Sequence, residues 1–211
     1  MRGGAESGRL FAGRGPAGGR APWAPVISVV VALVALSGWI GAAAMARDRT
    51  SVSWSGPLEC SGSRVSEEHV VGRSASGQAM QLRPSMRCRL TVKVENHSWL
   101  PVELSSLRLP LMGPGGGPAV EVREFDGRSP RASQEDDVDA VFGMHSRLAG
   151  GEAREFAIVF TFRPDGCTAQ GLMWVAGMPQ VEVTSLGRSG AQSTDEVIGF
   201  RGTDETDNCG P

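Results

Sequence analysis

Apolar and polar residues alternate along several short stretches in the second half of the chain, which is the pattern of strands with one buried face. The alternation is strictest over residues 87–95. It recurs over Ala153–Phe162, and we expect its inward aromatic and aliphatic residues at the centre of the core. Shorter stretches of the same kind lie at residues 102–111, 119–125, 138–142, 180–186 and 196–200. No window after residue 47 repeats apolar residues at a helical period.

Short strands separated by Gly and Pro turns predict an all-β fold, an antiparallel β-sandwich, with a small barrel as the alternative. Residues 92–104 read V-x-V-E-N-H-S-W-L-P-V-E-L, and residues 148–152 read L-A-G-G-E. In this pattern a strand ends at a polar turn before a Pro-Val strand, and a Leu-x-x-Gly-Glu turn enters a later strand. Over roughly residues 86–163 the chain resembles bacterial exported immunoglobulin-like sandwich domains, which implies the fold but no function.

One apolar stretch near the N-terminus is long enough to cross a bilayer. Residues 26–45 carry no charge, and a helix of that length spans roughly the 30 Å of bilayer hydrocarbon. Four Arg and one Glu precede it, so the positive-inside rule predicts a single pass through the plasma membrane with a cytoplasmic N-terminus. Secretion after cleavage near Ala44 or Ala46, where small residues precede, is the alternative.

The predicted organisation has four parts. A disordered cytoplasmic tail covers residues 1–24 and a transmembrane helix, the signal anchor, covers residues 25–46. A polar stalk over residues 47–57 leads to an extracytoplasmic β-sandwich domain over residues 58–211. Membrane lipid is the partner expected for the helix. The net charge of -2 gives no reason to expect a nucleic-acid partner.

All four cysteines follow the apolar stretch, so an oxidising compartment and two disulfides are expected for Cys60, Cys88, Cys167 and Cys209. Four cysteines allow three pairings. We favour Cys60 with Cys88 and Cys167 with Cys209, because each bond would tie a terminal or loop segment to a strand. Cys88 with Cys167 is the second choice. Without a close C-x-x-C pair, zinc ligation is disfavoured.

Sequence motifs give no indication of catalysis or of a cofactor. The chain lacks a G-x-S-x-G elbow, and its single lysine, Lys93, has no serine three residues before it. The glycine-rich residues 113–117 lack the Lys and the Ser or Thr of a phosphate loop. We therefore expect a protein that is not an enzyme.

Metal binding is the alternative function. His69, His97 and His145 lie in polar contexts and are expected to be exposed, although together with Met144 they could form a copper-type site. The acidic run 135–139 and the acidic tail 204–208 could bind calcium, but neither matches the twelve-residue calcium loop.

The motif Asn96-His97-Ser98 fits a glycosylation sequon. Arg outnumbers Lys by 20 to 1 with abundant Gly and Ala, which indicates a bacterial gene in which the sequon is accidental. Trp99, beside this turn and Pro101, is expected to be half-buried.

The expected function is binding or a structural role in the cell envelope. A membrane-anchored extracytoplasmic sandwich would bind another envelope component, a protein or a glycan, or stiffen an assembly, without catalysis. Sandwich function usually resides in end loops, and the longest predicted connections are residues 113–118 and 126–137. The alternative is a membrane-anchored extracytoplasmic protein that binds copper or calcium.

Overall fold

The structure of the chain is a computed structural model that describes residues 24–70, 76–129, 138–167 and 171–202. All of the predicted cytoplasmic tail except Ala24 lies outside these residues. The chain divides after Gly38, and the unit from Trp39 onward contains the end of the helix and every described strand. The elements are α1 (Ala24–Asp48), β1 (Thr50–Trp54), β2 (Glu59–Ser61), β3 (Val65–His69), β4 (Ser76–Gln81), β5 (Arg87–Asn96), β6 (Val102–Leu109), β7 (Val120–Phe125), β8 (Ala140–Leu148), β9 (Ala153–Phe162), β10 (Leu172–Ala176), β11 (Gln180–Ser185), β12 (Arg188–Ser193) and β13 (Val197–Arg201).

Helix α1 covers the predicted span and continues two residues beyond it. Within its segment Val26–Asp48, an 18-residue window has a mean hydropathy of 2.3. Every side chain from residue 26 to residue 41 is exposed. By length and composition the helix is able to cross a membrane, which fits either an anchor or a signal sequence.

The two most regular alternations in the sequence form the centre of the first sheet, β5 and β9, which pair antiparallel along nearly their whole length. On β9, Phe156, Ile158 and Phe160 are buried, and Phe162 at the strand end is half-buried against the core. This confirms the predicted core. The inward side chains of β5 are all fully buried: Cys88, Leu90, Val92 and Val94.

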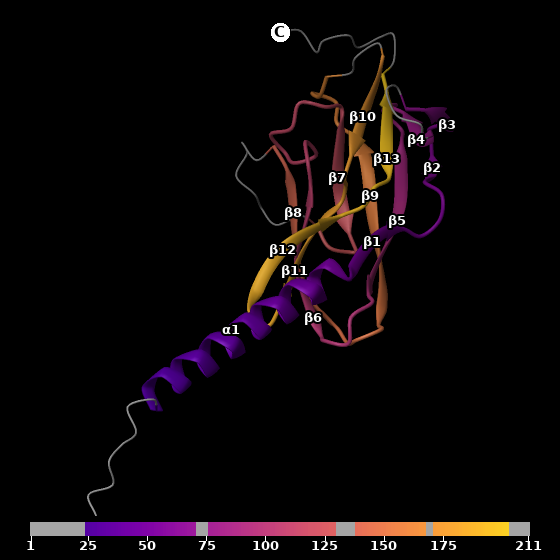
Figure 1. Cartoon of the computed structure of the whole chain (residues 1–211). Helices are drawn as coiled ribbons and strands as arrows, with labels where there is room; N and C mark the ends of the chain where they lie inside the picture. Colours follow the sequence, from indigo (N-terminus) through magenta and orange to yellow (C-terminus); the bar gives the residue numbers. More distant parts are fainter. Residues whose placement is uncertain (1–23, 71–75, 130–137, 168–170, 203–211) are drawn as a thin grey trace, which may run out of the picture. The chain divides into compact units, whose positions relative to one another are not determined.

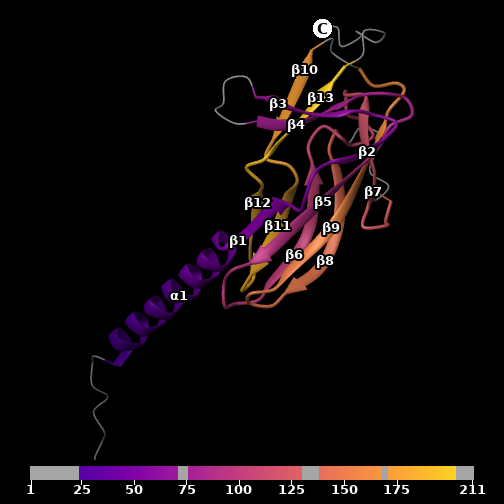
Figure 2. The same ribbon diagram turned by 90° about the vertical axis from the view of Figure 1, so that its right-hand side faces the viewer.

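The strands form an immunoglobulin-like β-sandwich, as predicted. The first sheet has the order β1-β5-β9-β7, with β2 also paired to β5, and the second has the order β12-β11-β6-β8. In space these orders match the A-B-E-D and G-F-C strands of immunoglobulin domains, with β8 beside the C strand. Along the chain, however, β7 in the D position comes before β8 in the C′ position, which reverses the order of these two strands in variable domains. Both sheets contribute to one core, and Figures 1 and 2 show the strands of the two sheets alongside one another.

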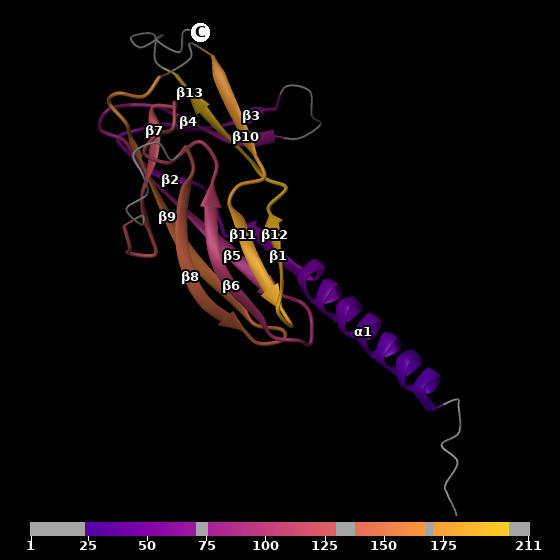
Figure 3. The same ribbon diagram turned by 90° about the vertical axis from the view of Figure 1, so that its left-hand side faces the viewer.

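A third sheet, which the sequence did not predict, has the order β10-β13-β4-β3. It lies at the end of the sandwich away from the β11–β12 turn, as Figure 3 shows. Its β4 and β13 pair in parallel, whereas both sandwich sheets are antiparallel. Met80, Ile198 and Phe200 from this sheet belong to the same hydrophobic core, so the third sheet is part of the domain.

The structure differs from the predicted stalk over residues 47–57. Strand β1 lies in this segment and pairs with β5 along its full length. Thr50 and Val52 are buried and Trp54 packs against the core, but serines alternate with these residues and the apolar face is short. Main-chain hydrogen bonds to β5 hold it, so hydropathy did not reveal it. The folded domain therefore begins immediately after α1.

Candidate functional site

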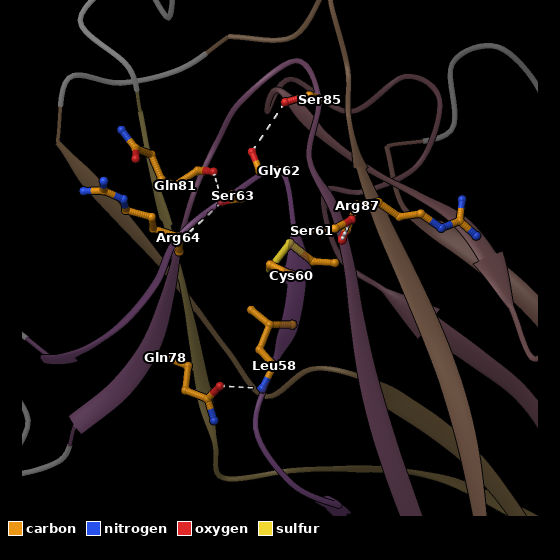
Figure 4. The surroundings of a disulfide bond; sticks show 11 residues. Leu58, Cys60, Ser61, Gly62, Ser63, Arg64, Gln78, Gln81, Ser85 and Arg87 are labelled. Carbon is orange, nitrogen blue, oxygen red and sulfur yellow. Dashed lines mark hydrogen bonds between the residues drawn. A yellow bond between two sulfur atoms is a disulfide. The ribbon is translucent and has the colours of Figure 1, made fainter.

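Cys60 and Cys88 form a disulfide between β2 and β5, the pairing favoured from the sequence. The two residues face each other in the antiparallel register, and Figure 4 shows the bond joining the short β2 to its neighbour. This bond excludes the alternative of Cys88 with Cys167. Cys167 is also disulfide-bonded. Its predicted partner, Cys209, lies outside the described residues.

A buried arginine holds the glycine-rich loop at residues 113–118, one of the two longest connections predicted from the sequence. Arg163 follows β9, and its guanidinium donates hydrogen bonds to the carbonyls of Gly113 and Gly116. Its side chain is 10% exposed, and its Nε lies 3.8 Å from a carboxylate oxygen of Glu121. Burial lowers the pKa of Arg163 and Glu121 opposes that shift. An arginine remains charged even so, and it places a positive charge beneath the loop.

Close packing also fixes this loop. A Cβ atom at Gly116 would lie 2.2 Å from the carbonyl oxygen of Leu111, so only glycine fits there. The Cys167 N–H donates to the Gly117 carbonyl at 2.7 Å, and the Ala119 N–H donates to the Cys167 carbonyl at 2.8 Å. These two hydrogen bonds therefore tie the end of the loop to Cys167, in the segment after β9.

A groove of about 660 Å³ lies between the two loops that the sequence singled out. Pro114 lines it from the first loop, Gly127 and Ser129 line it from the second, and the edge strand β7 forms a wall. The structure thus brings together two candidate segments that are separate in sequence. Residues 130–137 of the second loop lie outside the described part of the chain. We take this groove as the candidate site and call it the β7 groove.

The charged side chains of β7 that line the groove are engaged in ion pairs. Arg123 lies 3.2 Å from Glu121, and Glu124 lies 3.0 Å from Arg87 of β5. Exposed pairs of this kind contribute only about 0–1 kcal/mol. They can exchange partners at little cost, so the groove offers both signs of charge to a ligand.

The structure places the three histidines in three different elements. His69 ends β3, His145 lies in β8, and His97 follows β5. The ring of His97 lies 3.0 Å from Ser51 Oγ and 3.7 Å from a carboxylate oxygen of Glu95. Among the described residues, no three His, Cys, Asp or Glu side chains gather as metal ligands. In the described part of the chain the three histidines therefore do not form the copper-type site of the alternative function.

Asp139 is the described end of the predicted acidic run; Glu135, Asp136 and Asp137 lie outside the described residues, as does the tail 204–208. Its carboxylate accepts the Leu111 N–H at 2.9 Å and the Arg108 Nε–H at 2.6 Å. Partial burial by itself would raise the pKa of Asp139, but these two donors outweigh it and hold the pKa below its ordinary value. Asp139 therefore joins the end of β6 to the start of β8.

The sequon residue Asn96 is fully buried at the end of β5. Its Nδ2 donates to the carbonyls of Leu100 at 2.8 Å and Ala149 at 3.0 Å. Its Oδ1 accepts the Ser98 N–H at 3.0 Å and the Ser98 hydroxyl at 2.7 Å. With every polar atom engaged and no exposed surface, this amide is closed to a glycosylating enzyme in the folded protein.

Trp99, three residues later, is 75% exposed, so its expected half-burial is wrong. The buried Asn96 side chain forms hydrogen bonds with main-chain groups of this loop, whereas the indole of Trp99 lies in solvent. The neighbouring connection approaches closely: a Cβ atom at Gly150 would lie 2.8 Å from the carbonyl oxygens of Ser98 and Trp99. Trp99 is thus displayed on a loop that is held in place.

A second groove, of about 400 Å³, lies where β1 meets the third sheet. Trp54 and Glu196 line it. The Glu196 carboxylate accepts the main-chain N–H of Trp54 at 2.7 Å and the Thr194 hydroxyl at 2.9 Å. These contacts join β1 to the segment before β13, which gives this carboxylate a structural role.

Comparisons with known proteins reveal no family. No protein-family model and no curated protein matches the chain. Among solved structures, the alkylpurine DNA glycosylase AlkC of Pseudomonas fluorescens matches with 13% identity and a TM-score of 0.31, covering 72% of this chain. This chain spans only 30% of the glycosylase. A PapD-like (ASH) domain of human CEP192 matches with 13% identity and a TM-score of 0.30, covering 71% of this chain and 89% of that domain.

Proposed function

We propose that this chain is a single-pass protein of the plasma membrane whose disulfide-braced sandwich lies outside the cell and binds another component of the envelope. The N-terminus stays in the cytoplasm, and the role is binding or structural rather than catalytic. The β7 groove is the binding site.

One observation supports the anchor most strongly. Large aliphatic side chains of α1 are exposed on all sides, with Val26, Ile27 and Val34 more than half exposed. No described part of the chain covers them. Water would penalise such a surface by roughly 25 cal/mol for each Å² of apolar area, whereas lipid hydrocarbon would not. The helix therefore suits a bilayer.

Charge and cysteine chemistry support the orientation. The four arginines before the span favour a cytoplasmic N-terminus. The Cys60–Cys88 disulfide suits an oxidising compartment on the other side of the membrane.

The groove supports binding by its position and its charges. It lies at the edge strand β7, which pairs with β9 on one side only. Its exposed ion pairs present carboxylate and guanidinium groups that a charged protein segment can engage. We therefore favour a protein partner over a glycan.

Topology is testable through the single lysine. Lys93 lies on β5 with its side chain 38% exposed and paired to Glu95. A membrane-impermeant amine reagent should label Lys93 in intact cells, and Lys93→Arg should abolish that label. A tag at the N-terminus should become accessible only after lysis. Labelling of Lys93 only in lysed cells would refute the proposed orientation.

Binding is testable by photocrosslinking from the groove. A photoreactive residue in place of Arg123 should crosslink one envelope component in cells. The matched control is the same residue in place of Ser66, which is also exposed but lies on β3 of the third sheet and does not line the groove. Equal products from both positions, or none from position 123, would contradict the proposed site, and a glycan product would correct the partner class.

A further inference from the structure

Three connections gather at the end of the sandwich where the chain leaves α1. Thr50 of β1 faces Asn96 of β5 in register, so the β5–β6 connection begins beside the helix end. The His97 N–H donates to the Arg49 carbonyl at 2.9 Å. Figure 3 shows the β5–β6 connection, the β8–β9 connection and the β11–β12 turn together at this end. We call it the helix end of the sandwich.

Two apolar side chains project from this end into solvent. Trp99 is 75% exposed and Leu186 is 39% exposed. Leu186 and Gly187 both have positive φ, at 49° and 75°, which is the twist of a tight two-residue hairpin turn. Both side chains are presented by ordered connections, because Asn96 holds the first and the hairpin holds the second. Tryptophan is enriched at membrane interfaces, where its ring meets lipid and its N–H meets water.

Arginine accompanies these apolar side chains. Arg188 lies next to the hairpin turn, with its guanidinium 5.9 Å from the ring centre of Trp39. The Arg47 guanidinium donates to the Ser189 carbonyl at 2.5 Å, and Arg49 is exposed. A guanidinium is well suited to bind phosphate oxygens.

The acidic groups at this end are largely balanced. Glu95 pairs with Lys93 at 2.7 Å, and Glu152 pairs with Arg154 at 2.9 Å. Asp48 lies between two arginines in sequence. Glu103, exposed on β6, faces Arg147 of β8 in register. The acidic groups at this end are thus matched by nearby basic ones, and Arg49 and Arg188 are the basic groups that anionic lipid would meet.

Helix length brings this end to the membrane surface. Ala43 and Ala46 are buried against the sandwich, so the helix is free of protein only up to about Ala42. From Ala24, where the helix begins, that is 19 residues or about 28 Å, close to the roughly 30 Å of hydrocarbon. A helix that spans the hydrocarbon therefore places residues 43–46, and the end of the sandwich that packs on them, at the lipid surface.

We propose that the helix end of the sandwich is a lipid-binding surface, with Trp99 and Leu186 in the interfacial layer and Arg49 and Arg188 on lipid phosphates. The proposal rests on the membrane anchor proposed above. It assigns a role to the exposed Trp99 that packing does not explain. A second copy of the chain on the same surface is an outcome that the test distinguishes.

The test uses the full chain in nanodiscs with fluorinated tryptophan and fluorine NMR. The five tryptophans give five signals, and Trp99→Phe identifies the one of interest. A paramagnetic lipid headgroup should cause loss of the Trp99 signal, whereas a water-soluble paramagnetic agent should spare it. Trp174 of β10, in the third sheet, is the internal control and should be unaffected by the lipid probe.

The outcomes separate the two proposals. If Trp39 responds to lipid but Trp99 responds only to the soluble agent, the anchor stands and the lipid-binding surface is refuted. If Trp39 does not respond to lipid, the anchor itself fails. Protection of Trp99 from both probes would indicate coverage by protein and would also overturn the proposal.

A charge variant provides a second readout. The Trp99 response should be stronger in nanodiscs containing anionic lipid than in purely zwitterionic ones. Arg188→Glu should remove that difference, whereas Arg89→Glu, at an exposed position of β5, should preserve it. An equal response in both lipids would exclude the arginine–phosphate part of the proposal.

Discussion

Replacing Asn96 with alanine should destabilise the sandwich more than any surface change of similar size. The substitution removes four hydrogen bonds of 3.0 Å or shorter, to Leu100, Ala149 and Ser98. A typical bond of this kind contributes about 1 kcal/mol net. Because the loop is at the surface and water can reach some of the orphaned groups, we expect a loss of about 3 kcal/mol in the free energy of unfolding.

The assay is chemical denaturation of the full chain in detergent, followed by tryptophan fluorescence. Ser61→Ala is the control, since it removes one 3.3 Å bond from an exposed residue and should cost less than about 0.5 kcal/mol. Asn96→Asp keeps the volume but loses both donors and buries a carboxylate, so it should be at least as damaging as alanine. A loss below about 1 kcal/mol for Asn96→Ala would refute the assigned role of this amide.

Three further predictions follow from the same structure. Replacing Cys60 and Cys88 with alanine opens a loop with a sequence separation of 28 and should cost about 3.5 kcal/mol in denaturation, whereas a negligible change would show that the bond is redundant. Arg163→Met should remove the charged donor from the Gly113 and Gly116 carbonyls, of which only Gly113 keeps another donor among the described residues, the Gly116 N–H. It should lower stability by about 2–4 kcal/mol and increase amide exchange in residues 113–118; unchanged exchange would contradict its anchoring role. Because Asp139 has a lowered pKa in the folded state, its stabilising contribution should be full above about pH 4 and lost as the pH falls below that value. Asp139→Asn should flatten this part of the pH dependence of unfolding, and an unchanged profile would argue against the assignment.

Sequence analysis located the strands in which apolar, buried side chains alternate clearly with polar, exposed ones. Strand β5 alternates without interruption, and β9 contributes the aromatic core, so period-2 patterning was sufficient for both. The favoured Cys60–Cys88 bond followed from a different argument, that it would tie a loop segment to a strand, and the structure has it between β2 and β5.

The remaining strands are held by main-chain pairing and carry little pattern. Strand β12 reads RSGAQS and β4 reads SGQAMQ, with only Met80 as a large buried residue. Neither sequence indicates a strand until a partner strand is known. The third sheet also depends on a parallel pairing between β4 and β13, which are far apart in the chain.

Sequence analysis identified the two loops of the candidate site but not the side chains that shape it. The two loops were singled out by their length and composition, and the β7 groove does lie between them. The buried Arg163 gave no sequence signal, because an arginine before a Pro-Asp-Gly turn usually lies in solvent. Trp99 was misjudged for a related reason: burial of Asn96 beneath the turn reverses the usual preference of both residues.

The state of the cysteines inside living cells tests the exported, membrane-anchored sandwich most directly. Cells are quenched with acid to freeze thiol exchange, free thiols are alkylated, and peptides of the full chain are mapped without reduction. We predict a peptide linked through Cys60 and Cys88 with neither residue alkylated. Recovery of both residues in alkylated form from newly quenched, growing cells would place the sandwich in a reducing compartment and contradict the account.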